Sequence, residues 1–181
     1  MFRLIFPTLT IIIVLFTTYS CKKVERFTQF SMTIEEELEL PSVIGINLPI
    51  AIPTMEIQTD VTQQLEINNK KKKHIERVFL EALEVAIVAP ANQDFNFLKS
   101  IRIFISALNL PEIVIAQEAD LKNQSTQNLF IHPVEKLDLA AYIKEDKIDL
   151  RVEIITDETL FKQLTIAIKS TFWVDAKVFA D

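Results

Sequence analysis

The sequence predicts an all-β protein, an immunoglobulin-like two-sheet β-sandwich of about seven or eight strands with one or two short helices. Apolar and polar residues alternate with a period of two through most of the chain after residue 28, which is typical of half-buried strands. Asn, Asp and Pro cluster between the alternating runs, where turns are needed. The chain has one cysteine, so the paired cysteines of antibody domains are absent and any relation to them is one of architecture.

The first alternating run predicts a strand over residues 29–40. Met32 and Leu38 belong to its apolar face, and Glu35 and Glu37 belong to its polar face. Glu36 falls on the apolar face and predicts a bulge or a sheet edge there. Prolines bound an irregular crossing segment after this strand, and a second strand is expected within residues 55–67.

The segment from Lys72 to Val88 fits two patterns. Its apolar residues recur at helical spacing, but it also alternates and is rich in β-branched residues near its end. We favour a helical turn near 70–77 followed by a strand near 78–89. A second short helix is predicted over 137–145, capped at Asp138.

The remaining strands are expected in the second half of the chain. Leu110-Pro111-Glu112 is interpreted as a turn between two of them. The expected strands cover residues 101–105, 113–116, 129–131, 148–154 and 164–178.

Residues 1–20 have the order of a secretory signal. One cation, Arg3, precedes an apolar run from Leu4 to Phe16, and a short polar stretch then leads to Cys21. The apolar run is shorter than the about 20 residues that a bilayer-spanning helix needs. An uncleaved N-terminal anchor is therefore the less favoured alternative.

The lone cysteine makes this segment resemble a bacterial lipoprotein signal peptide, with Ser20 as the small residue before Cys21. Thr18 and Tyr19 depart from the usual lipobox, the short motif that ends at the acylated cysteine. Such relaxed lipoboxes occur in lipoproteins of some Gram-negative groups. The resemblance implies cleavage before Cys21, attachment of a diacylglycerol and palmitate-type acyl chains to it, and stable membrane anchoring. It implies a lipidated tether over residues 21–27, and the length and alternation of the rest predict a single sandwich domain over 28–181. An ordinary cleaved signal, with Cys21 as a bystander, is the other alternative.

Two stretches of the body, 95–116 and 137–158, resemble a pattern in uncharacterised β-sandwich lipoproteins of Gram-negative bacteria. The resemblance implies no biochemical activity and no functional residues. Lys22 follows the cysteine where an Asp would favour retention at the inner membrane, so the outer membrane is the expected location. The sequence does not distinguish a protein that faces the periplasm from one that faces the cell surface.

Composition excludes several function classes. The net charge of −6 argues against nucleic acid as a partner, because affinity there comes from neutralising phosphates. Gly45 is the only glycine, so neither a glycine-rich phosphate loop nor a G-x-S-x-G nucleophile turn can form. His74 and His132 lack metal-ligand spacing. We therefore expect no metal, no cofactor and no enzymatic activity.

A few residues remain as candidates for surface contact. The lysine run Lys70, Lys71, Lys72 and Lys73 is either a solvated loop or a contact for anionic headgroups. Trp173, the only tryptophan, lies opposite the apolar face of its strand and would mark a binding surface if exposed.

The expected role is that of a lipid-anchored cell-envelope protein in binding, assembly or structure, with an envelope protein as a possible partner. One alternative is an envelope hydrolase that uses paired carboxylates such as Asp157 and Glu158. The other is a carrier that holds a small ligand or lipid between the sheets. The sequence leaves the ligand and the oligomeric state open.

Overall fold

The computed structural model describes residues 28–42, 46–52, 55–58, 71–121 and 124–177. The described elements are β1 (Gln29–Leu40), β2 (Pro49–Ala51), β3 (Met55–Gln58), η1 (Lys72–His74), β4 (Ile75–Ala89), η2 (Phe95–Phe97), β5 (Leu98–Ala107), β6 (Leu110–Glu118), β7 (Asn128–Pro133), α3 (Ala140–Ile143), β8 (Lys147–Thr156) and β9 (Leu164–Ala176). Every described strand pairing is antiparallel.

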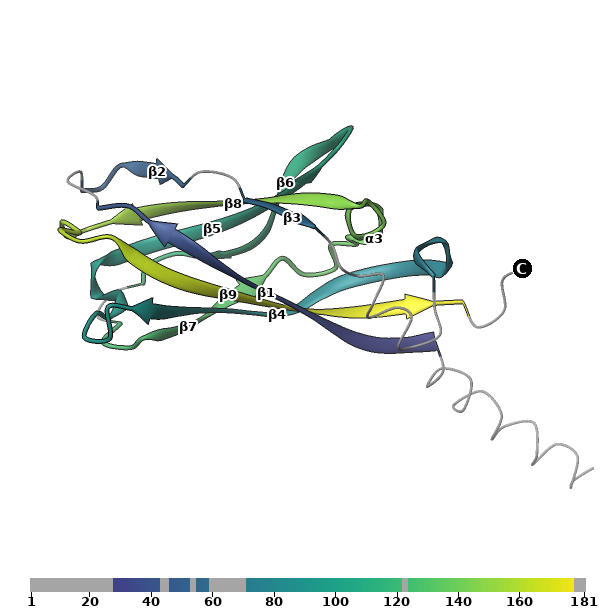
Figure 1. Ribbon diagram of the computed structural model, residues 1–181, viewed down its shortest axis with the longest axis horizontal. Coiled ribbons are helices and arrows are strands. Elements are labelled where there is room, and N and C mark those ends of the chain that lie inside the picture. The colour runs from purple at the N-terminus through teal and green to yellow at the C-terminus, as the bar shows by residue number, and fades with distance from the viewer. Residues whose placement is uncertain (1–27, 43–45, 53–54, 59–70, 122–123, 178–181) are drawn as a thin grey trace, which may run out of the picture.

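The strands form two layers that pack face to face (Figure 1). One layer has the order β1-β9-β4-β7, and the other has β6-β5-β8 with both β2 and β3 paired to β8. The layers are joined where β6 and β7 pair over two residues, Ala116 with Pro133 and Gln117 with His132. The predicted all-β two-sheet sandwich is therefore confirmed.

The pairings are nested along the chain. β1 pairs with β9, β2 and β3 with β8, β4 with β7, and β5 with β6. A long antiparallel ribbon of this kind, folded over into two sheets, is the jelly-roll form of β-sandwich. In an immunoglobulin domain the first two strands are neighbours in one sheet, whereas β1 here pairs with the last described strand. The connectivity is thus that of the jelly roll rather than the immunoglobulin-like default.

Alternation explains why these residues form these strands. In β5, Ile101, Ile103 and Ile105 are buried between the sheets, while the residues between them face outward. The same pattern runs through β8 and β9, and the buried side chains of both sheets form one continuous apolar cluster. Burial of this apolar surface is the main favourable term that holds the two layers together.

Several boundaries differ from the sequence prediction. The turn between β5 and β6 lies at Leu108-Asn109, because Asn109 adopts a left-handed φ of 60°, and Leu110-Pro111-Glu112 belongs to β6. β4 begins earlier than expected, at Ile75, which pairs with Ala176.

Other local predictions are confirmed fully or in part. The helical turn before β4 is the single 3₁₀ turn η1. The short helix predicted over 137–145 is the single turn α3, and its N-cap residue is Leu139 rather than Asp138. Asp138 instead accepts hydrogen bonds from the backbone N–H groups of Ala140, at 2.9 Å, and Val78, at 3.0 Å, and so ties α3 to β4. Glu36 lies on an edge strand that pairs with β9 in unbroken register, so the edge interpretation holds without a bulge. The expected second strand is β3 in its first part, and residues 59–67 lie outside the described residues.

The sandwich has two ends, which we call the N-terminal end, where the chain enters β1, and the distal end, which lies opposite. At the N-terminal end β1 begins and β9 finishes, with Gln29 paired to Asp175. At the distal end, on the left of Figure 1, the β4–β5 and β8–β9 connections and the approach to β2 come together. None of the described helices is long and apolar enough to cross a membrane.

Candidate binding surfaces

The described part of the lysine run lies at the N-terminal end of the sandwich. The backbone N–H of Lys177 donates to the carbonyl of His74 at 2.9 Å, which places η1 beside the end of β9. Lys71 and Lys73 are exposed there. Because β1 starts at the same end, these lysines flank the point where the chain enters the fold. Lys70 lies outside the described residues.

Lys72 differs from its neighbours because its ammonium is engaged. Its Nζ donates to Asp146 Oδ1 at 2.8 Å and to the carbonyl of Glu145 at 3.0 Å. The hydrogen bond from Lys72 and its charge lower the pKa of the Asp146 carboxyl. Lys72 therefore ties η1 to the loop after α3, and Lys71 and Lys73 are left as the described members of the run that can contact another surface.

Trp173 lies on the outer face of the β1-β9-β4-β7 sheet and is half-buried. Its ring stacks on Phe79 with centroids 5.6 Å apart, and the Arg77 guanidinium lies 5.7 Å from its centroid. Arg77 also donates to Asp175 at 2.8 Å, and this hydrogen bond raises the pKa of Arg77. Trp173 is thus held in an aromatic and cationic stack rather than standing free as an exposed platform.

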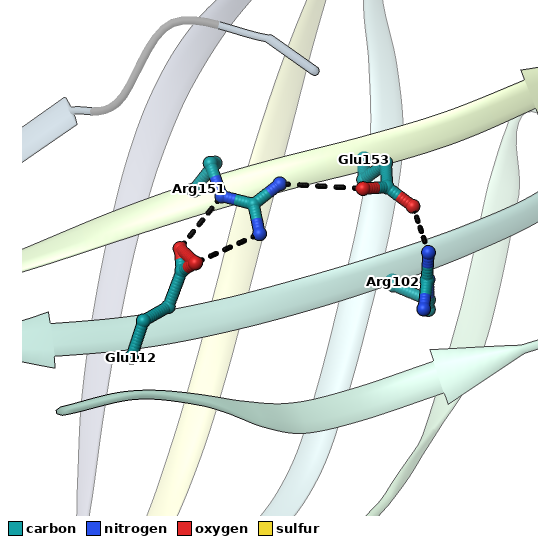
Figure 2. Close-up of polar contacts among 4 residues, drawn as sticks. All are labelled: Arg102, Glu112, Arg151 and Glu153. Atoms are coloured by element: carbon teal, nitrogen blue, oxygen red, sulfur yellow. Dashed lines mark hydrogen bonds and ion pairs between the residues drawn. The ribbon is translucent and has the colours of Figure 1, made fainter. Parts of the chain in front are cut away.

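The outer face of the second sheet carries an array of charged side chains that Figure 2 shows in detail. Arg151 on β8 donates to both oxygens of Glu112 on β6, at 2.6 and 2.9 Å, and to Glu153 at 3.4 Å. Glu153 also accepts from Arg102 on β5. These four residues, which we call the charge array, link three strands.

Phe104 lies within this array. The Arg151 guanidinium stands 3.8 Å from the centroid of its ring, and Arg102 stands 5.6 Å from it. The hydrogen bond between Arg151 and Glu112 lowers the pKa of the Glu112 carboxyl and raises the pKa of Arg151. Two cations and two carboxylates compensate one another, so the array braces the sheet and covers an aromatic ring that would otherwise face water.

A shallow pocket of about 380 Å³ continues from Arg102 toward the sheet junction. It is lined by Ser100, Arg102, Gln117 and Ala119 together with the paired side chains of Glu118 and His132. His132 is exposed on β7, whereas His74 is half-buried at the N-terminal end. The structure does not bring the two histidines to one site, and no group of three or more His, Cys, Asp or Glu among the described residues is placed to hold a metal ion.

The distal end collects the paired acids that the sequence suggested for hydrolysis. Asp157 and Glu158 line an open polar pocket of about 440 Å³ together with Asp94. Asp94 accepts from the backbone N–H of Asn96 at 3.2 Å and so caps η2. A third acid therefore joins the predicted pair, although it lies about 60 residues away in the chain.

A second pocket of mixed polarity adjoins this acidic pocket. It has a volume of about 350 Å³, is lined by Phe161, Leu160 and Pro90 together with polar residues that include Lys162, and shares Phe97 and Glu158 with the first. Phe161 is one of the most exposed large apolar side chains among the described residues. Sequence reasoning missed this neighbourhood, because only the β4–β9 and β5–β8 pairings of the fold bring the β4–β5 and β8–β9 connections together.

Comparisons with known proteins leave the chain without an assigned family. No family model matches it, and no curated protein matches it. Solved structures similar to it include a decameric BFDV capsid protein, with a TM-score of 0.40, 7% identity, and 82% of this chain and 98% of that chain covered. Turnip yellow mosaic virus gives a TM-score of 0.30 at 10% identity, with 85% of this chain and 98% of that chain covered. Cocksfoot mottle virus gives a TM-score of 0.30 at 10% identity, with 84% and 86% covered. TM-scores this low support no conclusion about function.

Proposed function

We propose that this chain is a lipoprotein of the bacterial cell envelope, anchored through acylated Cys21, whose β-sandwich has a non-enzymatic binding, assembly or structural role. The signal-like order of residues 1–20 and the position of the lone cysteine support the anchor. The absence of an Asp after Cys21 favours the outer membrane. An envelope protein is the partner class that this location offers.

The geometry of the N-terminal end is the observation that carries the proposal. The described chain starts at Thr28, seven residues after Cys21, and fully extended residues span at most about 3.6 Å each. The N-terminal end would therefore lie within roughly 25 Å of the headgroups. Lys71 and Lys73 are exposed at that same end, where a lysine near an anionic surface contributes about 1 kcal/mol to attraction.

The two alternatives receive unequal support. A carrier needs space between the sheets, and the described side chains there form one continuous buried cluster. A carboxylate-based hydrolase is supported by the open, polar pocket that Asp94, Asp157 and Glu158 line together. Glycosidic hydrolysis would further need two of these carboxyl groups about 5–9.5 Å apart on either side of a substrate. Turnover of envelope polysaccharide that is lost in Asp157→Asn would favour this second function over the first.

Metabolic labelling tests the anchor directly. Cells that produce the full chain are grown with an alkyne fatty acid, and the label on the protein is measured after membrane extraction at high pH. The proposal predicts label and membrane retention for the natural chain and for Thr18→Leu, which restores the usual box. Both should be lost in Cys21→Ala. Equal membrane retention of Cys21→Ala without label would refute the anchor and favour an uncleaved N-terminal segment.

A further inference from the structure

The three connections at the distal end are fastened to one another by backbone hydrogen bonds. The N–H of Asn47 donates to the carbonyl of Thr156 at 2.7 Å, and the N–H of Asp157 donates to the carbonyl of Phe97 at 3.1 Å. Lys99 Nζ adds a bond of 2.9 Å to the Asn47 side chain. The approach to β2, the β4–β5 connection and the β8–β9 connection therefore form one connected surface, which we call the distal surface.

Large apolar side chains project from this surface. Phe161 is 85% exposed and Leu48 is 62% exposed. Leu48 and the half-exposed Ile46 flank Asn47, whose left-handed φ of 59° is uncommon for a residue other than glycine. A single exposed apolar side chain is ordinary, but several on mutually fastened loops are typical of an interaction site.

Carboxylates lie directly beside these side chains. Glu158 and Phe97 line both the acidic pocket and the pocket that Phe161 borders, so the two pockets adjoin. Asp94 and Asp157 complete the acidic side, and the described residues form no ion pair with Asp157 or Glu158. The distal surface thus combines exposed aromatic and aliphatic groups with three carboxylates, which outnumber the two lysines named there, Lys99 and Lys162.

We propose that the distal surface is a docking site for a protein partner that offers an apolar pocket bordered by lysine or arginine. Such a partner would bury Phe161 and Leu48 and pair its cations with Asp157 and Glu158. An anionic membrane or a nucleic acid would be repelled by the same carboxylates. Pairing of two distal surfaces would bring together two sets of carboxylates that outnumber the lysines beside them, which disfavours a second copy of this chain.

The inference holds whether or not Cys21 is acylated, because it depends on charge and exposure at the opposite end of the sandwich. If the anchor is also present, β9 separates the two ends. Its 13 residues rise about 3.3 Å each and span about 40 Å. That distance is several times the Debye length of about 8 Å, so the anchoring membrane would not influence the distal charges.

Photocrosslinking in the native cells tests the proposal with the full chain. A photoreactive phenylalanine analogue replaces Phe161 or Leu48, and the control replaces Leu108, which is similarly exposed on the β5–β6 turn. We expect one discrete protein adduct from positions 161 and 48 and none from position 108. Its yield should fall at least tenfold in Asp157→Lys/Glu158→Lys and stay unchanged in Glu135→Lys, a charge reversal in the β7–α3 loop.

Four outcomes would overturn the inference. They are an adduct of lipid alone, an adduct of two copies of this chain, equal yield from position 108, or a yield that does not respond to reversal of the two acids. Circular dichroism and urea unfolding of each variant check that the fold is retained. Because the replaced side chains are exposed, each variant should unfold at the same urea midpoint as the natural chain. Loss of the anchor in Cys21→Ala is scored separately, so failure of one proposal is distinguishable from failure of the other.

Discussion

Replacement of Arg151 by methionine should destabilise the sandwich measurably although the residue lies on its surface. The guanidinium makes a two-bond ion pair with Glu112 and stands 3.8 Å from the centroid of the Phe104 ring. The side chains of Arg151 and Glu112 are 23% and 39% exposed, so solvent screens the ion pair and limits it to about 1 kcal/mol. The contact with Phe104 contributes about 0.5–1 kcal/mol.

The two contributions share one guanidinium and do not add fully, so Arg151→Met should cost about 1–1.5 kcal/mol. In a chain of this size that corresponds to a fall in melting temperature of about 2–6 °C. Methionine keeps much of the apolar stem of arginine, which limits the change to the charged head. A matched control is Lys147→Met, because the Lys147–Glu56 pair is exposed on both sides and should be nearly neutral.

Urea unfolding of the natural chain, Arg151→Met, Glu112→Gln and the double variant measures the coupling between the two residues. We expect a coupling free energy of about 0.5–1 kcal/mol that decreases in high salt. A coupling indistinguishable from zero, or an effect of Arg151→Met no larger than that of Lys147→Met, would refute the structural role of the charge array.

Three further predictions follow from the described contacts. Ile103 is fully buried at the centre of β5, so Ile103→Ala should cost about 2–5 kcal/mol in urea unfolding, and a cost below 1 kcal/mol would contradict the packing of the two sheets. The lowered pKa of Glu112 means that its contribution to stability is fully present above the unfolded-state pKa and is lost as the pH falls through the folded-state pKa. Glu112→Gln should therefore reduce the acid-induced loss of stability, whereas an unchanged pH profile would exclude the ion pair. Since Trp173 is the only tryptophan, Arg77→Ala should shift its fluorescence to the red and increase quenching by acrylamide, and unchanged emission would contradict the stack.

Alternation was sufficient to locate the strands because each buries one face. Residues 148–154 show the pattern without interruption, residues 29–40 show it with Glu36 as the one exception, and both are strands. The sequence pattern predicted turns less well, because the position of a turn depends on the backbone conformation of single residues. The proline in Leu110-Pro111-Glu112 favours a turn there, but the segment belongs to β6. The residue with left-handed φ that makes the turn is Asn109, one position earlier.

Pairing between distant strands could not be read from the sequence. Alternation is the same in a jelly roll and in an immunoglobulin domain, since both bury one face of each strand. The charge array illustrates the difficulty, because Arg102, Glu112 and Arg151 come from three strands that only the register brings together. The polar positions of each strand were predictable, but their cross-strand partners were not.

The sequence predicted the positions of the candidate residues better than their neighbours, because the neighbours come from distant parts of the chain. Trp173 was expected on the outer face and lies there, but its neighbours Phe79 and Arg77 come from β4 and cover it. Asp157 and Glu158 were visible as adjacent acids, whereas Asp94 joined them only through the packing of the β4–β5 connection. Cys21 and Lys70 lie outside the described residues, and their roles stay predictions.

Intact mass spectrometry of the chain isolated from its native membrane tests the central claim most directly. Acylation predicts a chain that starts at Cys21 and carries a diacylglycerol thioether, with a further acyl chain on the new amine in bacteria that add one. A chain that starts elsewhere, or that starts at Cys21 with an unmodified thiol, would contradict anchoring through that residue.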